Sequence, residues 1–408
     1  MQQAEEGGWL ATAKTFLRDL YMFLLTLNVL ERMVGSEFIF DWMRWYVIVG
    51  TTYYAIKNVT KLFTSGFKSF STSDSSPGPP TRVAGPRLQK TTRSGCSEAG
   101  SALSLEFAVS EMQGWRESME DCSVSLTSLE QPLDGLAMFS VFDGHGGPAV
   151  SKLCAQSFPT ELLRHARAAS VVDLEEILTK TYVEMDNIIF EAGSVAPGGK
   201  VAVVENIEGR IERKNLFDFT GCTAVTALIS TEKVTVANAG DSRCLLCRGG
   251  EAIELSHDHK PESPRERTRI EKAGGKVTAI GPCFRVDWGL NLSRSLGDFA
   301  YKRNGDLPAS EQKISSMPDL ITETLRHDDE FIVLGCDGIF ELLTSQQVID
   351  FVRSGIQRGL KLEKIAEALL DECCSKDPSL TAGKGTDNET CVIIKLNREA
   401  KREVVADQ

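Results

Sequence analysis

The sequence predicts an α+β protein in which an antiparallel sheet core is covered by helices. Between residues 223 and 255, four short apolar segments are separated by turns of two to four residues, as in antiparallel strands joined by hairpins. Segments with helical spacing stand before and after these strands and do not alternate with them. This grouping favours an antiparallel sheet over a doubly wound parallel sheet, in which strands and helices alternate.

Length and composition bound the class of protein. The 408 residues are 42% hydrophobic and 25% charged, which is typical of a folded globular protein with one large domain plus further segments, or with two to three domains. The net charge of −12 argues against general nucleic-acid binding, which needs a basic face, and suits divalent cations and basic peptides. Eleven cysteines without a cleavable signal peptide predict free thiols in an intracellular, cytoplasmic compartment.

Residues 1–70 form an aromatic-rich extension with three of the five Trp and four of the six Tyr residues. Its charge-free stretches, Leu20–Leu30 and Trp45–Ile56, contain 11 and 12 residues, whereas a membrane span needs roughly 20. Aromatic residues near the ends of apolar segments are typical of a membrane interface. We predict shallow membrane contact on the cytosolic side, and a helical pair packed on the folded domain or on a partner stays open.

The rest of the chain divides into a linker, a folded domain and a tail. Residues 71–101 are rich in Ser, Pro and Gly and lack apolar periodicity, which predicts a flexible linker. The folded domain is predicted over residues 102–397, and residues 398–408 form a C-terminal tail. Within the domain, Gly193–Phe219 has the appearance of a loop insertion.

Local patterns predict the elements of the domain in order. Apolar residues at helical spacing predict helices over Pro148–Arg164 and Asp173–Glu191, the second capped by Asp173. Short apolar runs bounded by turn residues predict a meander of four strands, namely Thr223–Ile229, Val234–Ala239, Cys244–Arg248 and Glu251–Leu255. A short polar helix and two late helices follow, over Pro264–Ala273, Thr344–Ile356 and Glu363–Cys373.

Cys244 and Cys247 have the two-residue separation of zinc and redox motifs. No second pair follows at zinc-ribbon spacing, and both cysteines lie in one predicted strand. We therefore interpret them as small hydrophobic residues, with a functional thiol pair as the minor alternative.

Four predicted apolar strands each carry an aspartate at one end. These aspartates are Asp143, Asp241, Asp337 and Asp387. The strongest case is Ala137–Phe142, a strand-length apolar run that ends in Asp143, a glycine and His145. Any one of these segments is also consistent with an ordinary Asp-Gly turn. Their recurrence predicts a carboxylate cluster, assembled by the sheet core, that binds hard cations.

Arg116 precedes the adjacent carboxylates Glu120 and Asp121 by four and five residues. Alone, this segment is consistent with a solvated charged turn. With the four aspartates, it predicts a site for two Mg²⁺ or Mn²⁺ ions, each of which takes one or two carboxylates and keeps several waters. A carboxylate that bridges two cations can hold a water of lowered pKa. Arg116 offers a planar fork to phosphate, and His145 can protonate a departing oxygen.

Seven motifs in order resemble those of the metal-dependent protein phosphatase family, the protein phosphatase 2C class, with closest similarity to its gamma-type branch. They are Trp115–Asp121, Asp143–Gly147, Thr220–Ala224, Gly240–Arg243, Leu292–Asp298, Cys336–Gly338 and Asp387–Asn388. The resemblance covers residues 104–397. It implies a four-layer αββα sandwich of two antiparallel sheets flanked by helices. It also implies that a water bridging two Mg²⁺ or Mn²⁺ ions hydrolyses phosphoserine and phosphothreonine in proteins, without a phosphoenzyme.

The same resemblance implies a role for each candidate residue. Arg116 would hold the phosphate, Asp121 would orient metal-bound water, and His145 would be the acid. The implied metal ligands are Asp143 as the bridge, Asp337 and Asp387 at one metal, Glu120 and the Gly144 carbonyl at the other, and Asp241 at a weaker third position with Asp337. Glu341 stands where members often carry Asp or Asn, so the geometry of the third position stays open.

Three other functions are alternatives to a phosphatase. An inactive binding module would be expected to lack one or more ligands, and no ligand is missing from this chain. An unrelated hydrolase of small phosphomonoesters is disfavoured by the motifs. Membrane recruitment with the phosphatase as effector is compatible with the main prediction and depends on residues 1–70. The expected partners are phosphoprotein substrates, with no nucleic acid, and the expected state is a monomer.

Overall fold

The structure, a computed structural model, describes residues 86–98, 101, 103–196, 200–201, 203–205, 211–213, 215–381 and 383–397, with no side chain described between residues 195 and 214. The chain divides into two units between residues 81 and 82, and everything below concerns the second. The predictions for residues 1–70 and 398–408 lie outside the described residues. No helix among the described residues is long and apolar enough to cross a membrane.

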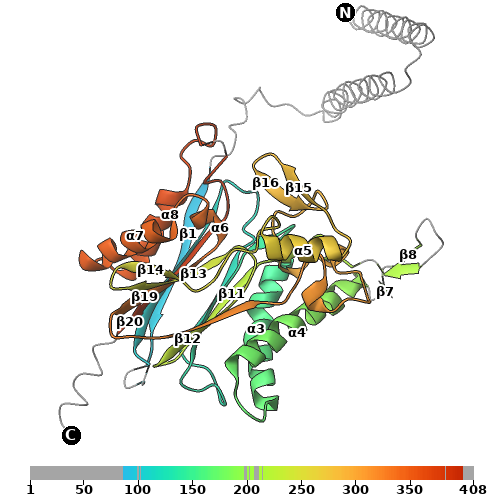
Figure 1. Cartoon of the computed structure of the whole chain (residues 1–408). Coiled ribbons are helices and arrows are strands. Elements are labelled where there is room, and N and C mark those ends of the chain that lie inside the picture. Colours follow the sequence, from blue (N-terminus) through green and yellow to red (C-terminus); the bar gives the residue numbers. More distant parts are fainter. Residues whose placement is uncertain are drawn as a thin grey trace, which may run out of the picture. The chain divides into compact units, whose positions relative to one another are not determined.

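Two antiparallel sheets form the middle layers of the molecule (Figure 1). The first has six strands in the order β1 (Arg87–Cys96), β2 (Leu105–Gly114), β20 (Glu389–Leu396), β19 (Asp329–Gly335), β13 (Arg243–Arg248) and β14 (Glu251–Glu254). The second has five strands in the order β18 (Asp319–Thr324), β12 (Lys233–Ala239), β11 (Ala224–Ile229), β4 (Ala137–Phe142) and β3 (Cys122–Leu126).

Helices cover the outer face of each sheet. The five-stranded sheet is covered by α3 (Ala149–Ala168) and α4 (Leu174–Ser194), and the six-stranded sheet by α7 (Ser345–Gln357) and α8 (Leu362–Cys373). The predicted four-layer αββα sandwich is therefore confirmed. As predicted, Asp173 caps α4, because its Oδ1 accepts hydrogen bonds from the backbone N–H groups of Glu175 and Glu176.

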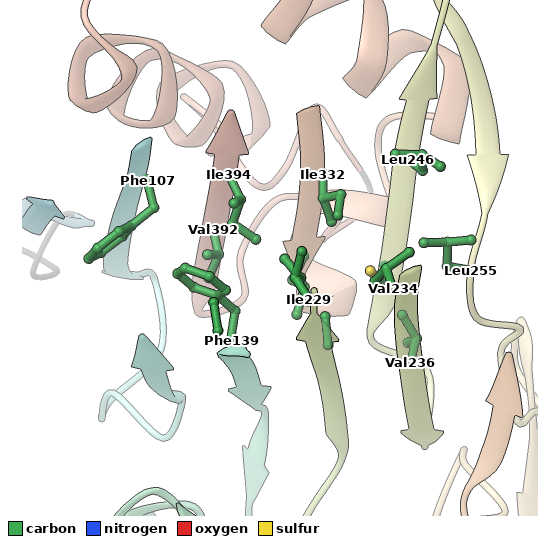
Figure 2. Packing of buried hydrophobic residues seen from close by; sticks show 14 of the residues in the cluster. Phe107, Phe139, Ile229, Val234, Val236, Leu246, Leu255, Ile332, Val392 and Ile394 are labelled. Carbon is green, nitrogen blue, oxygen red and sulfur yellow. The ribbon is translucent and has the colours of Figure 1, made fainter. Parts of the chain in front are cut away.

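Strand β4 shows why the inner strands are mostly apolar along their whole length. Side chains alternate between the two faces of a strand, so Phe139 and Val141 face the core between the sheets, whereas Met138 and Phe142 face α3 and α4. Both faces are covered, so every position of β4 is buried. Figure 2 shows the inter-sheet core, where Phe139 meets Phe107 of the other sheet edge-on with ring centroids 5.3 Å apart.

The remaining elements are short and surround this sandwich. A three-stranded sheet is formed by β5 (Gly144–His145), β10 (Gly221–Cys222) and β17 (Leu296–Gly297), and a hairpin by β15 (Val277–Ile280) and β16 (Cys283–Val286). There are two short helices, α5 (Pro264–Lys272) and α6 (Asp337–Phe340), and two 3-10 turns, η1 (Phe299–Tyr301) and η2 (Ala309–Glu311). The predicted insertion contains two further pairs, β6 (Val195–Ala196) with β7 (Lys200–Val201) and β8 (Val203–Glu205) with β9 (Ile211–Arg213).

The predicted linker over residues 71–101 is wrong for the segment that forms β1. This segment pairs antiparallel with β2 from Arg87 opposite Gly114 to Cys96 opposite Glu106. It is an edge strand with mostly exposed side chains, so it carries no apolar pattern that sequence reasoning can detect. Hydrogen bonds from Lys90 to Asp371 and from Ser94 to Glu363 also tie it to α8 and its start.

The predicted four-strand meander is divided between the two sheets. The hairpins β11–β12 and β13–β14 form as predicted, but β12 and β13 belong to different sheets. The chain crosses from one sheet to the other at Gly240–Ser242. This crossing places Asp241 where the ends of both sheets meet.

Cys244 and Cys247 point to opposite faces of β13, because they are an odd number of residues apart. Cys244 lies in the core between the sheets, and Cys247 lies in the core beneath α7 and α8. All eleven cysteines are free, and burial raises the pKa of both thiols in this pair. The geometry supports the interpretation of these two residues as small hydrophobic side chains.

Candidate active site

The three-stranded sheet of β5, β10 and β17 begins directly after β4. Its register places His145 opposite Gly221, which in turn lies opposite Gly297. The backbone of Asp143 is held at the junction, where Thr223 N–H donates to the Asp143 carbonyl over 2.8 Å. The buried strand β4 therefore delivers Asp143 and His145 to a rigid support.

Eight of the nine predicted site residues line one pocket of about 660 Å³. They are Arg116, Glu120, Asp143, Gly144, His145, Asp241, Asp337 and Asp387. The ninth, Asp121, is buried, and its carboxylate lies within 4.8 Å of that of Asp143. The structure thus brings together residues spread over about 270 positions of sequence, while their chemical roles stay predictions.

Glu120 reaches the pocket because its backbone passes close to Gly144. A Cβ on Gly144 would lie 2.3 Å from the Glu120 carbonyl oxygen, so only glycine fits there. The Glu120 carboxylate accepts hydrogen bonds from Ser118 Oγ over 2.5 Å and from Gly147 N–H over 2.9 Å. These contacts orient the carboxylate beside the Gly144 backbone.

Asn388 connects the three segments that carry Glu120, Asp337 and Asp387. Its Oδ1 accepts from the Glu120 N–H over 2.8 Å, and its Nδ2 donates to the carbonyls of Gln113 and Ser118 over 2.8 and 3.0 Å. A Cβ on Gly338 would lie 2.2 Å from the Asn388 carbonyl oxygen. This close approach sets the start of α6, and hence Asp337, beside the loop that carries Asp387.

The carboxylates repel one another in a buried site. Burial raises the pKa of Asp143 and of Asp337 well above the ordinary range, and the neighbouring carboxylates raise both further. Burial also raises the pKa of Asp121 to about 7, although Thr390 Oγ1 donates a hydrogen bond to its Oδ2 over 2.8 Å. Asp121 Oδ1 is buried without a hydrogen-bond partner among the described residues. Such a cluster of hard oxygen donors fits divalent cations.

The Cys336 thiol lies within 4.8 Å of the Asp121 and Asp143 carboxylates but does not have the character of a ligand. Burial raises its pKa well above the ordinary value, which keeps the thiol neutral. Its Sγ accepts a hydrogen bond from Thr390 N–H over 3.1 Å. The five predicted ligand side chains that line the pocket are all carboxylates, and carboxylate oxygens are the donors that Mg²⁺ and Mn²⁺ prefer.

Two cationic side chains pair with these carboxylates. The partly exposed Arg116 guanidinium forms an ion pair with Asp387, and the Lys260 ammonium forms one with Asp241. Burial opposes the charge on Lys260, but Asp241 outweighs it and raises the Lys260 pKa. Sequence reasoning missed Lys260, although it follows a polar Asp258-His259 pair soon after β14.

Asp298 is the second residue that sequence reasoning left without a role. Its Oδ2 lies 2.7 Å from His145 Nε2 and 2.5 Å from Ser295 Oγ, and the residue is fully buried. Burial lowers the pKa of His145, but the Asp298 carboxylate outweighs this effect, so the pKa is raised overall. The backbone of Asp298 is left-handed, with φ of 55°. Its place at the end of the Leu292–Asp298 motif was the available indication.

Glu341 also lines the pocket. It follows Asp337 by one helical turn, and its N–H donates to the Asp337 carbonyl over 2.8 Å. Burial and the Asp387 charge raise the pKa of its carboxyl group. A further carboxylate is therefore present in the pocket that Asp241 and Asp337 line.

Comparisons with known proteins agree on one family. The protein phosphatase 2C family model matches residues 105–379. Probable protein phosphatase 2C 11 of Oryza sativa subsp. japonica is 37% identical over 337 residues, covering 76% of this chain and 90% of the relative. Probable protein phosphatase 2C 6 of Paramecium tetraurelia is 38% identical over 312 residues, covering 76% and 99%.

Solved structures share the fold. A phosphatase from a pathogenic strain of Toxoplasma gondii superimposes with a TM-score of 0.59 at 24% identity, covering 76% of this chain and 96% of that one. A C. elegans sex determining protein superimposes with a TM-score of 0.57 at 23% identity, covering 74% and 66%.

Proposed function

This chain belongs to the protein phosphatase 2C family and is a metal-dependent protein serine/threonine phosphatase, and we propose that it hydrolyses phosphoserine and phosphothreonine in the pocket that holds the carboxylate cluster. The observation that supports this site is the convergence of the five predicted ligand carboxylates, Arg116 and His145 on one pocket of about 660 Å³.

The proposed metal ligands are those that face the pocket. Asp143 would bridge two cations, with Asp337 and Asp387 completing one site and Glu120 and the Gly144 carbonyl completing the other. Asp241 would hold a weaker third cation with Asp337. The raised pKa values of Asp143 and Asp337 support this assignment, because bound cations would relieve the repulsion that raises them. When bound, two Mg²⁺ or Mn²⁺ ions would supply a nucleophilic water of lowered pKa.

The side chains of this chain would do the remaining work. Arg116, at the mouth of the pocket, would bind the phosphate dianion through its planar fork. Asp121 would accept a hydrogen bond from the attacking water and orient it. His145, held by Asp298, would donate its proton to the departing serine or threonine oxygen. No side chain of the protein acts as the nucleophile in this scheme, so no phosphoenzyme forms.

The test is hydrolysis of a phosphothreonine peptide by the full chain. We expect activity to vanish in EDTA and to return with Mn²⁺ or Mg²⁺, whereas full activity in chelator would contradict the proposal. Asp337→Asn should abolish turnover and weaken Mn²⁺ binding measured by calorimetry. Asp350→Asn, which changes an exposed aspartate of α7, is the matched control and should change neither.

Direct attack by water makes a second measurable prediction. A rapid quench during turnover of a ³²P-labelled phosphoprotein should leave no label on the enzyme. Acid-stable label on this chain in proportion to active sites would exclude the proposed mechanism while leaving the phosphatase activity established.

A further inference from the structure

The turn that follows β16 holds a tryptophan in an unfavourable conformation. Asp287 and Trp288 have φ angles of 46° and 68°, and the Gly289 N–H donates to the Val286 carbonyl over 2.9 Å. These are the features of a type I′ turn, in which Asn-Gly or Asp-Gly is strongly preferred. A left-handed Trp is a conformational outlier, and the Trp288 side chain is nevertheless 68% exposed.

Several contacts force this conformation on Trp288. Asp287 Oδ1 accepts from the Lys276 N–H over 2.8 Å, and its Oδ2 forms an ion pair with Lys313 over 2.8 Å. Arg285 Nη1 donates to the Gly289 carbonyl over 2.5 Å. Trp288 itself is absent from the small core beneath the turn, which contains Ile270, Val286, Tyr301 and Ile314. The strain at Trp288 is therefore not offset by packing within the described fold.

The strained turn adjoins the active-site pocket. Arg285 before it and Leu290, Asn291 and Leu292 after it all line that pocket. The β15–β16 hairpin that leads into the turn stands beside α5, outside the two main sheets (Figure 1). Strained residues that the surrounding structure over-determines tend to lie at functional sites.

A second exposed aromatic side chain continues this surface toward His145. Phe219 is 68% exposed, and its ring meets that of Tyr301 edge-on with centroids 6.2 Å apart. The Tyr301 hydroxyl abuts the turn, because a Cβ on Gly289 would lie 2.0 Å from it. The Phe219 backbone touches the active-site loop, since a Cβ on Gly146 would lie 2.4 Å from its carbonyl oxygen. We call the exposed Phe219 and Trp288 the aromatic rim, and the buried Tyr301 links Phe219 to the turn.

The proposed chemistry indicates which part of a substrate would meet this rim. The departing oxygen belongs to the substrate's serine or threonine. The substrate polypeptide therefore lies on the side of the phosphate that faces the general acid. His145 is that acid under the proposed function, on which this step rests. The next residue, Gly146, touches Phe219. The rim therefore adjoins the side from which the substrate polypeptide extends.

We propose that the aromatic rim binds the polypeptide flanking the phosphorylated residue, and that Trp288 packs against an apolar side chain there. An indole ring offers a large, rigid apolar surface at small conformational cost. The turn exposes the Trp288 ring to solvent beside the pocket. Contact with substrate would explain why a strained and exposed tryptophan stands at this position.

The test compares two classes of substrate, a small phosphate ester and phosphopeptides, on three variants. p-Nitrophenyl phosphate has no polypeptide, whereas phosphothreonine peptides can carry leucine or alanine on both sides of the phosphorylated residue. We expect Trp288→Gly and Phe219→Ala each to lower kcat/KM for the leucine peptide, relative to that for p-nitrophenyl phosphate, by about fivefold, mainly through KM. Val171→Ala removes part of a side chain that is 75% exposed between α3 and α4 and should leave this ratio unchanged.

Thermal unfolding separates substrate binding from a structural role. Trp288→Gly relieves the left-handed strain, so we expect its unfolding midpoint to rise by about 2 °C. A residue that served the fold would instead lower the midpoint when it is removed.

Two results would overturn the inference. One is that both rim variants keep the wild-type ratio of kcat/KM for the leucine peptide to kcat/KM for p-nitrophenyl phosphate. The other is that the wild-type protein has equal kcat/KM for the leucine and alanine peptides. If the wild-type protein hydrolysed neither p-nitrophenyl phosphate nor phosphopeptide with Mn²⁺, the proposed function itself would be refuted. Metal-dependent hydrolysis without rim selectivity would refute the rim alone.

Discussion

His145 and Asp298 show how one buried carboxylate favours the protonated form of an imidazole, the form that the proposed acid role requires. The 2.7 Å contact between His145 Nε2 and Asp298 Oδ2 holds the ring and favours its protonated form. Asp298 itself is held by Ser295 Oγ. The pair forms because β17 and β5 flank β10, so that residues 153 positions apart become neighbours.

Removing the imidazole should affect substrates according to their leaving groups. His145→Ala should lower kcat for a phosphothreonine peptide by about 10²- to 10⁴-fold, and Asp298→Asn should cause a smaller loss of the same kind. p-Nitrophenyl phosphate should lose less, because nitrophenolate departs without a proton. His257→Ala, which changes an exposed histidine, is the control. Equal loss of kcat on both substrates would exclude His145 as the acid.

Asp143 illustrates the conflict between stability and function at the scale of one residue. Its raised pKa means that the metal-free folded protein binds a proton there more tightly than the unfolded chain does. The stability of the metal-free protein therefore falls as pH rises above the ordinary carboxyl range.

An amide at position 143 should relieve this repulsion. In EDTA at pH 7, Asp143→Asn should raise the unfolding midpoint by about 2–4 °C while abolishing phosphatase activity. Mn²⁺ should raise the midpoint of the wild-type protein and leave that of the variant nearly unchanged. Differential scanning fluorimetry with and without Mn²⁺ measures both, and a variant less stable than wild type in EDTA would contradict the prediction.

At the scale of elements, α5 is tied to the loop before β17 by a buried ion-pair cluster. The Glu266 carboxylate pairs with Arg294 over 2.7 Å and with Arg269 over 2.5 Å. Arg294 also pairs with Asp319 at the start of β18 over 2.7 Å. Burial raises the pKa of Glu266, but the two guanidinium groups and Ser293 outweigh it and bring the pKa to about 2.

This lowered pKa predicts how the stability of the α5 contact depends on pH. The folded pKa lies below the unfolded value, so the contribution of Glu266 is complete above about pH 4.5 and is lost as pH falls toward 2. Glu266→Gln should destabilise the protein by about 3 kcal/mol at pH 7, and the deficit should shrink progressively below pH 4.5. Urea unfolding at pH 7, 4 and 3 tests this. Glu271→Gln, at an exposed position of the same helix, should show no such trend.

Strand β1 extends the folded domain beyond the boundary that composition predicts. A chain of residues 86–408 retains β1, and we expect it to keep full phosphatase activity. A chain of residues 97–408 exposes the edge of β2 and loses the contacts of Lys90 and Ser94 with Asp371 and Glu363. Its unfolding midpoint should be at least about 5 °C lower. Equal midpoints for the two chains would show that β1 contributes little.

At the scale of the whole molecule, two sheets face each other and their ends meet at the pocket. Asp143 follows β4 of the five-stranded sheet, and Asp337 follows β19 of the six-stranded sheet. Asp241 lies on the crossing between β12 and β13. The carboxylate cluster is therefore assembled only when both sheets have formed and packed together.

The prediction of membrane contact by residues 1–70 lies outside the described residues and can be tested separately. Each Trp or Leu side chain buried in a bilayer contributes roughly 1.5–3 kcal/mol, so a few would hold the protein there without a span. In liposome flotation, residues 1–408 should float and residues 86–408 should stay at the bottom. Equal partitioning of both would favour a packing or partner-binding role for the extension.

The sequence by itself determined the elements whose cause is local. Strand β4 matches the predicted run Ala137–Phe142, because a strand covered on both faces is predominantly apolar. The cap at Asp173 was readable from the sequence, since its side chain bonds to backbone within three residues. The motif order identified the family and all nine candidate site residues.

Tertiary structure alone decided which strands pair and which side chains meet. Strand β1 has no apolar pattern because its stability comes from backbone pairing at an edge. The division of the meander depends on which sheet accepts β13. The contacts of Asp298 with His145 and of Lys260 with Asp241 form between separate elements. Alternation along a strand specifies which face is buried, but only long-range packing selects the partner that covers it.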